Sequence, residues 1–100
     1  MRVRQFYNKN QFVITGDNKI VFQSYNSTCA VINRKGDLIL GTDWDYSKTT
    51  LKHLYLFLED YYNALNPDTR ENLNDLKYSN NKRQYIQKLI DKKILKMKEL

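Results

Sequence analysis

The sequence predicts an α+β fold in which a four-stranded antiparallel sheet is followed by a long helix and a C-terminal helical segment. Two observations lead to this fold class. Residues 11–40 hold short runs of β-branched and aromatic residues separated by turn-forming residues, which is typical of strands. Near Trp44 the apolar spacing lengthens to three or four residues, which is typical of helices. We expect one domain over residues 1–100, with the sheet and main helix in 1–66 and a basic helical tail in 67–100.

Four strands are expected before residue 41: Gln11–Thr15, Ile20–Tyr25, Thr28–Asn33 and Asp37–Leu40. The first two flank Gly16-Asp17-Asn18, and the last two flank Arg34-Lys35-Gly36. Both connections predict hairpins, because glycine and asparagine tolerate the positive φ that tight turns require. A fifth strand over Val3–Tyr7 is an open alternative, since the pattern there is weak.

The main helix is expected from about Ser47 to Leu65. Its apolar residues recur on one side of a helix: Leu51, Leu54, Tyr55, Leu58, Tyr62 and Leu65. Ser47 is a natural N-cap, because its hydroxyl can accept from the N–H of Thr49 or Thr50. Tyr46 and Leu51 occupy the two positions of a hydrophobic staple. Trp44 is expected to fill the corner where the last strand and the helix meet.

Two further helices are expected in the tail. Asn66 and Pro67 suit the cap and first position of a short helix over Pro67–Tyr78. After the breaking run Ser79-Asn80-Asn81, an amphipathic helix is expected from Lys82 to about Lys98. Its apolar stripe comprises Ile86, Leu89, Ile90, Ile94 and Met97. This stripe is expected to pack against another apolar surface. That surface belongs to the rest of the chain, to a second copy of the same helix in a homodimer, or to the target.

Basic residues gather in this tail. The chain has a formal net charge of +6, which favours anionic partners. The candidate partner-binding residues are Lys82, Arg83, Lys88, Lys92, Lys93 and Lys96. No apolar run is long enough to span a membrane, and the N-terminus lacks the apolar region of a secretory signal. The sequence therefore predicts no membrane partner and a cytoplasmic location.

The residues that carry catalysis or bind metals are few. His53 is the only histidine, and it is expected as a surface imidazole beside the apolar stripe. Cys29 is the only cysteine, and its apolar neighbours favour a buried small side chain over a nucleophile. Asp43 and Asp45 precede a helix, where acids normally complement its positive end. We therefore expect no enzymatic activity, no metal site and no cofactor.

The segment FQSYNSTCAVINRKGDLILGTDWDYSKTTLKHLYLFL resembles a family of small proteins carried by phages, prophages and plasmids of Gram-positive bacteria. Their pattern is a Ser-Tyr-x-Ser/Thr strand end, an Ala-Val strand and Trp-Asp-Tyr-Ser-x-Thr-Thr-x-Lys leading into a helix. The matching residues, over roughly 10–60, are Ser24, Tyr25, Ser27 or Thr28, Ala30, Val31, Trp44, Asp45, Tyr46, Ser47, Thr49, Thr50 and Lys52. The block from Trp44 to Thr50 is expected to be structural.

The resemblance implies a non-enzymatic protein of a mobile genetic element that inhibits a host defence system. Similar small proteins include anti-CRISPR inhibitors, which bind a CRISPR effector nuclease complex. The implied partner is a bacterial effector protein or its guide nucleic acid, in the cytoplasm of the bacterial host. The alternative, from the residues themselves, is a small regulator of a phage or plasmid that binds DNA or RNA directly through the basic C-terminal helix.

Overall fold

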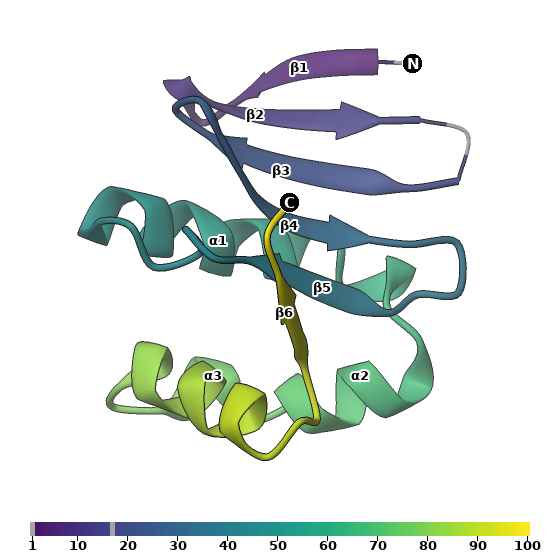
Figure 1. Ribbon diagram of the computed structural model, residues 1–100, viewed down its shortest axis with the longest axis vertical. Helices are drawn as coiled ribbons and strands as arrows, with labels where there is room; N and C mark the ends of the chain where they lie inside the picture. Colours follow the sequence, from purple (N-terminus) through teal and green to yellow (C-terminus); the bar gives the residue numbers. More distant parts are fainter. Residues whose placement is uncertain (1, 17) are drawn as a thin grey trace.

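The computed structural model describes residues 2–16 and 18–100, with the backbone alone at residues 8 and 9 (Figure 1). It confirms the α+β class: a sheet formed mainly by the first 41 residues precedes a group of helices. One residue of the expected first turn, Asp17, lies outside the described residues.

The sheet has six strands in the described residues, and they lie side by side in chain order. They are β1 Arg2–Phe6, β2 Asn8–Thr15, β3 Ile20–Ser24, β4 Ser27–Ile32, β5 Leu38–Gly41 and β6 Lys96–Lys98. The first five form an antiparallel meander, whereas β6 pairs in parallel with β5. The four predicted strands are confirmed with small shifts at their ends, the open alternative at Val3–Tyr7 exists as β1, and β6 was not predicted.

The hairpin between β4 and β5 has glycine where the sequence placed a left-handed residue. Gly36 has φ +82°, and a Cβ there would lie 2.5 Å from the backbone nitrogen of Asn66. That nitrogen donates a hydrogen bond of 3.0 Å to the Gly36 carbonyl. Glycine is therefore required twice, for the turn and for the close approach of the next helix.

Helical segments make up most of the chain after residue 47: α1 Lys48–Asp60, η1 Tyr62–Ala64, α2 Pro67–Leu73, η2 Leu76–Tyr78 and α3 Lys82–Asp91. The expected caps are present, because Ser47 accepts from Thr50 N–H and Asn66 accepts from Thr69 N–H. The α-helix ends at Asp60 rather than at Leu65, since the chain tightens into a 3₁₀ turn that leaves Leu65 extended and 2% exposed.

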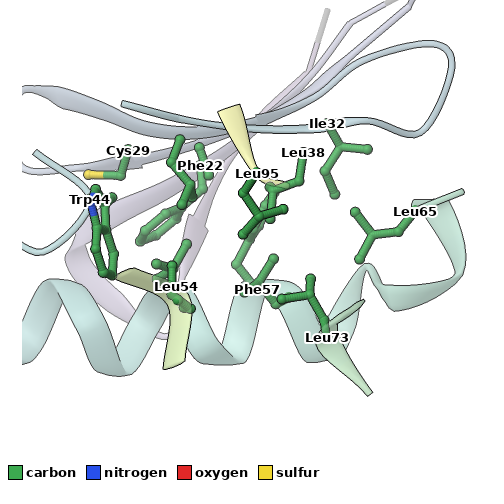
Figure 2. Packing of buried hydrophobic residues seen from close by; sticks show 14 of the residues in the cluster. Phe22, Cys29, Ile32, Leu38, Trp44, Leu54, Phe57, Leu65, Leu73 and Leu95 are labelled. Atoms are coloured by element: carbon green, nitrogen blue, oxygen red, sulfur yellow. The ribbon is translucent and has the colours of Figure 1, made fainter. Parts of the chain in front are cut away.

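The core lies between α1 and one face of the sheet (Figure 2). Phe22 of β3 stacks on Phe57 of α1 with ring centroids 5.4 Å apart. Trp44, 1% exposed, fills the corner between β5 and α1, as the sequence predicts. Within the described residues, no helix is long and apolar enough to span a membrane.

The expected surface position of His53 is wrong. Its ring is 5% exposed, with Nδ1 2.8 Å from the carbonyl oxygen of Thr49. The fully buried positions of α1 are Thr50, His53, Leu54, Phe57 and Leu58. The buried stripe is therefore centred one residue away from the apolar stripe of the sequence, and it takes in the histidine while Leu51 and Tyr55 are only partly buried.

The expected tail helix to about Lys98 is also wrong beyond Asp91. Lys93 adopts φ +62°, its N–H donates to Ile90 O, and Ile94 N–H donates to Leu89 O, both at 2.9 Å. This pair of bonds is a Schellman motif, which ends a helix and reverses the chain. Leu95 then enters the core at 4% exposure, whereas the expected stripe residues Ile94 and Met97 are 45% and 44% exposed.

Candidate partner-binding surface

The six basic residues singled out from the sequence lie on three consecutive elements. Lys82, Arg83 and Lys88 belong to α3, Lys92 and Lys93 form the turn after it, and Lys96 lies on β6. Between residues 82 and 98 there are seven lysines and arginines and one aspartate, an excess of six positive charges. This excess equals the formal net charge of the whole chain, +6.

Arg83 is engaged within the fold. Its Nη2 lies 2.7 Å and its Nε 2.9 Å from Oδ2 of Asp45, and its guanidinium lies 5.9 Å from the Trp44 ring centroid. Asp45 thus pairs with a residue of α3 instead of only complementing the start of α1. The contact fastens α3 to the loop before α1, and it neutralises much of the charge that Arg83 offers to a partner.

Lys82 borders a groove of about 510 Å³. Its Nζ lies 6.0 Å from the Tyr55 ring centroid, within reach of a cation–π contact. Burial raises the pKa of the Tyr55 hydroxyl. The groove is lined by Tyr55, Leu58, Glu59, Tyr62, Leu73, Asn74, Leu76, Lys77 and Lys82. Lys82 is therefore half-buried at a groove wall, and it is not part of the open surface.

Five lysines form the exposed part of the tail, and we name them the basic cluster: Lys88, Lys92, Lys93, Lys96 and Lys98. None of them takes part in an ion pair among the described residues. The one acid between residues 82 and 98, Asp91, accepts from the Gln87 amide at 2.9 Å. The backbone that carries them is held by the Schellman turn and by the pairing of β6 with β5. The basic cluster is thus a charged surface on fixed elements.

The block from Trp44 to Thr50 joins the sheet to α1. The Oγ of Ser24 and the Oγ1 of Thr50 are 2.9 Å apart and buried, and Ser27 Oγ donates to Asp43 at 2.9 Å. Tyr46 departs from expectation: it is 70% exposed, and its ring lies 6.3 Å from that of Tyr25. It therefore does not act as the expected hydrophobic staple.

The thiol of Cys29 and the imidazole of His53 both lie inside the fold. Cys29 is 0% exposed, as the sequence predicts, and burial raises its pKa to about 11. The thiol therefore stays protonated at neutral pH and is a poor nucleophile. Within residues 2–16 and 18–100, no three His, Cys, Asp or Glu side chains gather where they could hold a metal ion.

Sequence reasoning missed the Arg83–Asp45 pair and the groove. The pair joins residues 38 positions apart, so no local pattern marks it. The apolar spacing of Leu73 and Leu76 marks a buried stripe, but only the approach of α1 and α3 turns its neighbourhood into a groove.

Comparison with known proteins identifies a family. The model of a family of unknown function, DUF8033, matches residues 1–75. No curated protein and no solved structure matches the chain. The matched part holds β1 to β5, α1 and α2, whereas α3 and the basic cluster lie beyond it.

Proposed function

We propose that this chain, which belongs to the DUF8033 family of unknown function, is a non-enzymatic inhibitor of a bacterial defence system that binds its target through the basic cluster. The target is a CRISPR effector nuclease complex in the cytoplasm of the bacterial host. The observation that carries the proposal is the cluster itself, five exposed lysines with no ion-pair partner in the described residues, on fixed elements.

Such a surface suits a complex that carries nucleic acid. Exposed lysines speed association with an anionic surface, and their contacts with phosphates weaken as salt rises. The likeness to small phage and plasmid proteins supports the choice of target. The buried, protonated Cys29 thiol supports a role in binding over a role in nucleophilic catalysis.

A plaque assay on CRISPR-immune bacteria tests the proposal, with this protein expressed from a plasmid. We expect phage to recover when the protein is present. The variant Lys88→Glu, Lys92→Glu, Lys93→Glu, Lys96→Glu should lose the effect. A matched control reverses four exposed basic residues elsewhere: Lys19, Arg34, Lys48 and Lys52. The control changes the net charge equally and should keep the effect. Equal loss in both variants would show that net charge alone matters.

The alternative is a small regulator that binds DNA or RNA directly, and the exposure of the basic cluster also favours it. Electrophoretic shift of generic duplex DNA at several salt concentrations separates the two functions. A regulator binds free nucleic acid with an affinity that falls steeply with salt. An inhibitor of an effector complex binds free DNA only weakly at physiological salt and copurifies with the effector.

A further inference from the structure

The face of the sheet that points away from α1 carries an apolar row. Only α1 overlaps the strands in Figure 1, while α2 and α3 lie beyond β5. Figure 2 shows α1 on the core side. Along each strand, residues of the opposite face alternate with core residues. Five of them stand directly opposite one another across β1 to β5: Val3, Ile14, Val21, Val31 and Ile39. We name them the open-face row.

Such a row is unusual for a sheet face without a helix. Uncovered faces of antiparallel sheets are normally polar, because they meet water. Here Val3 at the edge is 58% exposed, and Ile14, Val31 and Ile39 are partly exposed. Val21 in the centre is 8% exposed, since its neighbours in the row flank it on both sides. A continuous apolar surface of this kind marks an interaction site.

The charges around the row restrict what binds there. None of its five members is charged, but at one end Ile39 pairs with Lys96 of β6. At the other end, the edge strand β1 contributes Val3 and Gln5 to this face, because Arg2 and Arg4 alternate with them and belong to the face of α1. The row is therefore an apolar strip with a basic group at its β6 end, and through Lys96 it is continuous with the basic cluster.

Nucleic acid does not match this strip. Bases bind to exposed aromatic rings and phosphates bind to cations, but the row is aliphatic and uncharged. Phe12, next to the row and paired with Gln5 and Gln23, is partly buried. A second copy of the chain matches poorly as well, because each copy carries a formal net charge of +6 and repels the other.

We propose that the open-face row binds a partner protein through an apolar strip on that protein flanked by carboxylates. Apolar centres with charged rims are the usual anatomy of protein interfaces, and the carboxylates would meet Lys96 and the basic cluster. The inference rests on the proposed function only for the identity of the partner, which is then the protein component of the effector complex. The interface is one surface, with the row at its centre and the basic cluster along its rim.

The test uses the full chain and defined peptides, so it is separate from the defence assay. An amphipathic helical peptide with a leucine stripe flanked by glutamates is titrated into the isotope-labelled protein. Two matched peptides carry lysines in place of the glutamates or serines in place of the leucines. We expect the acidic apolar peptide alone to shift the backbone resonances of Ile14, Val21, Val31 and Ile39.

Variants then locate the contact. Val31→Lys should raise the dissociation constant of the peptide about tenfold or more, which corresponds to about 1.4 kcal/mol. Val3→Lys, at the exposed edge, is the second variant should Val31→Lys disturb folding. Tyr78→Lys changes a side chain that is 75% exposed on η2, away from the sheet, and should leave the affinity unchanged.

Four results would overturn the proposal. They are equal shifts with all three peptides, shifts confined to the helices, shifts of the row by an oligothymidine strand, and a dimer in sedimentation equilibrium that Val31→Lys dissociates. The last result would make a second copy the occupant of the face. Loss of the defence effect together with retained peptide binding would reject the proposed function alone.

Discussion

At the scale of single residues, Lys93 is a site of backbone strain. Its φ of +62° lies in the left-handed region, which costs a residue with a side chain about 1–2 kcal/mol relative to glycine. We expect Lys93→Gly to raise the free energy of unfolding by about 1 kcal/mol in urea titrations. Lys92→Gly is the matched control: it removes the same charge at φ −83° and should lower stability by about 0.5–1 kcal/mol. Equal effects of the two variants would contradict the Schellman turn.

The Cys29 thiol makes stability depend on alkaline pH. Burial raises its pKa from 9.0 to about 11, so the folded protein holds this proton more tightly than the unfolded chain does. The contribution is complete below pH 9.0 and is lost as the pH rises towards 11. We expect the stability advantage of the native protein over Cys29→Ala to narrow across this window in urea titrations. A constant difference would show that the thiol titrates normally.

The buried contact between Ser24 and Thr50 connects β3 to the start of α1, with the two hydroxyl oxygens 2.9 Å apart. Removing one hydroxyl leaves the other buried without this partner, which costs about 1–3 kcal/mol. We expect Thr50→Val to destabilise the protein by this amount and Ser24→Ala to cost less, because Thr50 Oγ1 also accepts from Ser47 Oγ at 3.1 Å. The double variant should lose less than the sum of the two. Strict additivity in thermal unfolding would mean that the hydroxyls do not interact.

At the scale of secondary structure, β6 is held by one buried side chain and by its pairing with β5. Leu95 is 4% exposed and lies near Leu38 and Phe57, whereas Met97 is 44% exposed (Figure 2). We expect Leu95→Ala to cost about 2–5 kcal/mol, as a buried leucine does, and Met97→Ala to cost less than about 1 kcal/mol. The reverse order would indicate that the tail continues as a helix after Asp91.

Apolar packing also contributes most of the stability that attaches α3 to the rest of the fold. Ile86 is 0% exposed, while the Arg83–Asp45 pair is partly open to water, with side chains 52% and 25% exposed. An ion pair this exposed contributes about 0–1 kcal/mol. Ile86 therefore provides most of the stability of the contact, and the ion pair sets the orientation of the helix.

At the scale of the whole molecule, we expect that the charge of the basic cluster can be changed with little effect on stability. Reversing Lys88, Lys92, Lys93 and Lys96 to glutamate changes the formal net charge by eight units from its native +6. Because these side chains are exposed, we expect the free energy of unfolding to change by about 0.5 kcal/mol or less per site. Association with an anionic partner should instead slow strongly at low salt and differ little at high salt. Stopped-flow binding and thermal unfolding on the same samples check both expectations.

The sequence alone determined the elements whose residues interact with near neighbours. The meander from β2 to β5 follows from short β-branched runs and turns with glycine or asparagine, and α1 from its apolar spacing and the Ser47 cap. The location of the excess charge was also readable, because exposed lysines need no partner to be recognised. The sequence also placed Lys82 and Arg83 among the partner-binding residues. In the structure these side chains contact Tyr55 and Asp45 on other elements, and no local pattern predicts such contacts.

Only the tertiary structure decided the features that depend on distant residues. The helix ends at Asp91 and the chain turns at Lys93, which allows Leu95 to pack in the core. The free energy gained by burying Leu95 outweighs the helical pattern of the local sequence. His53 became buried because the sheet and helices cover α1 on a different stripe from the one its apolar residues suggest. The open-face row exists only once the strand register sets Val3, Ile14, Val21, Val31 and Ile39 opposite one another. Register depends on which face of each strand the core buries, and that is a property of the assembled sheet.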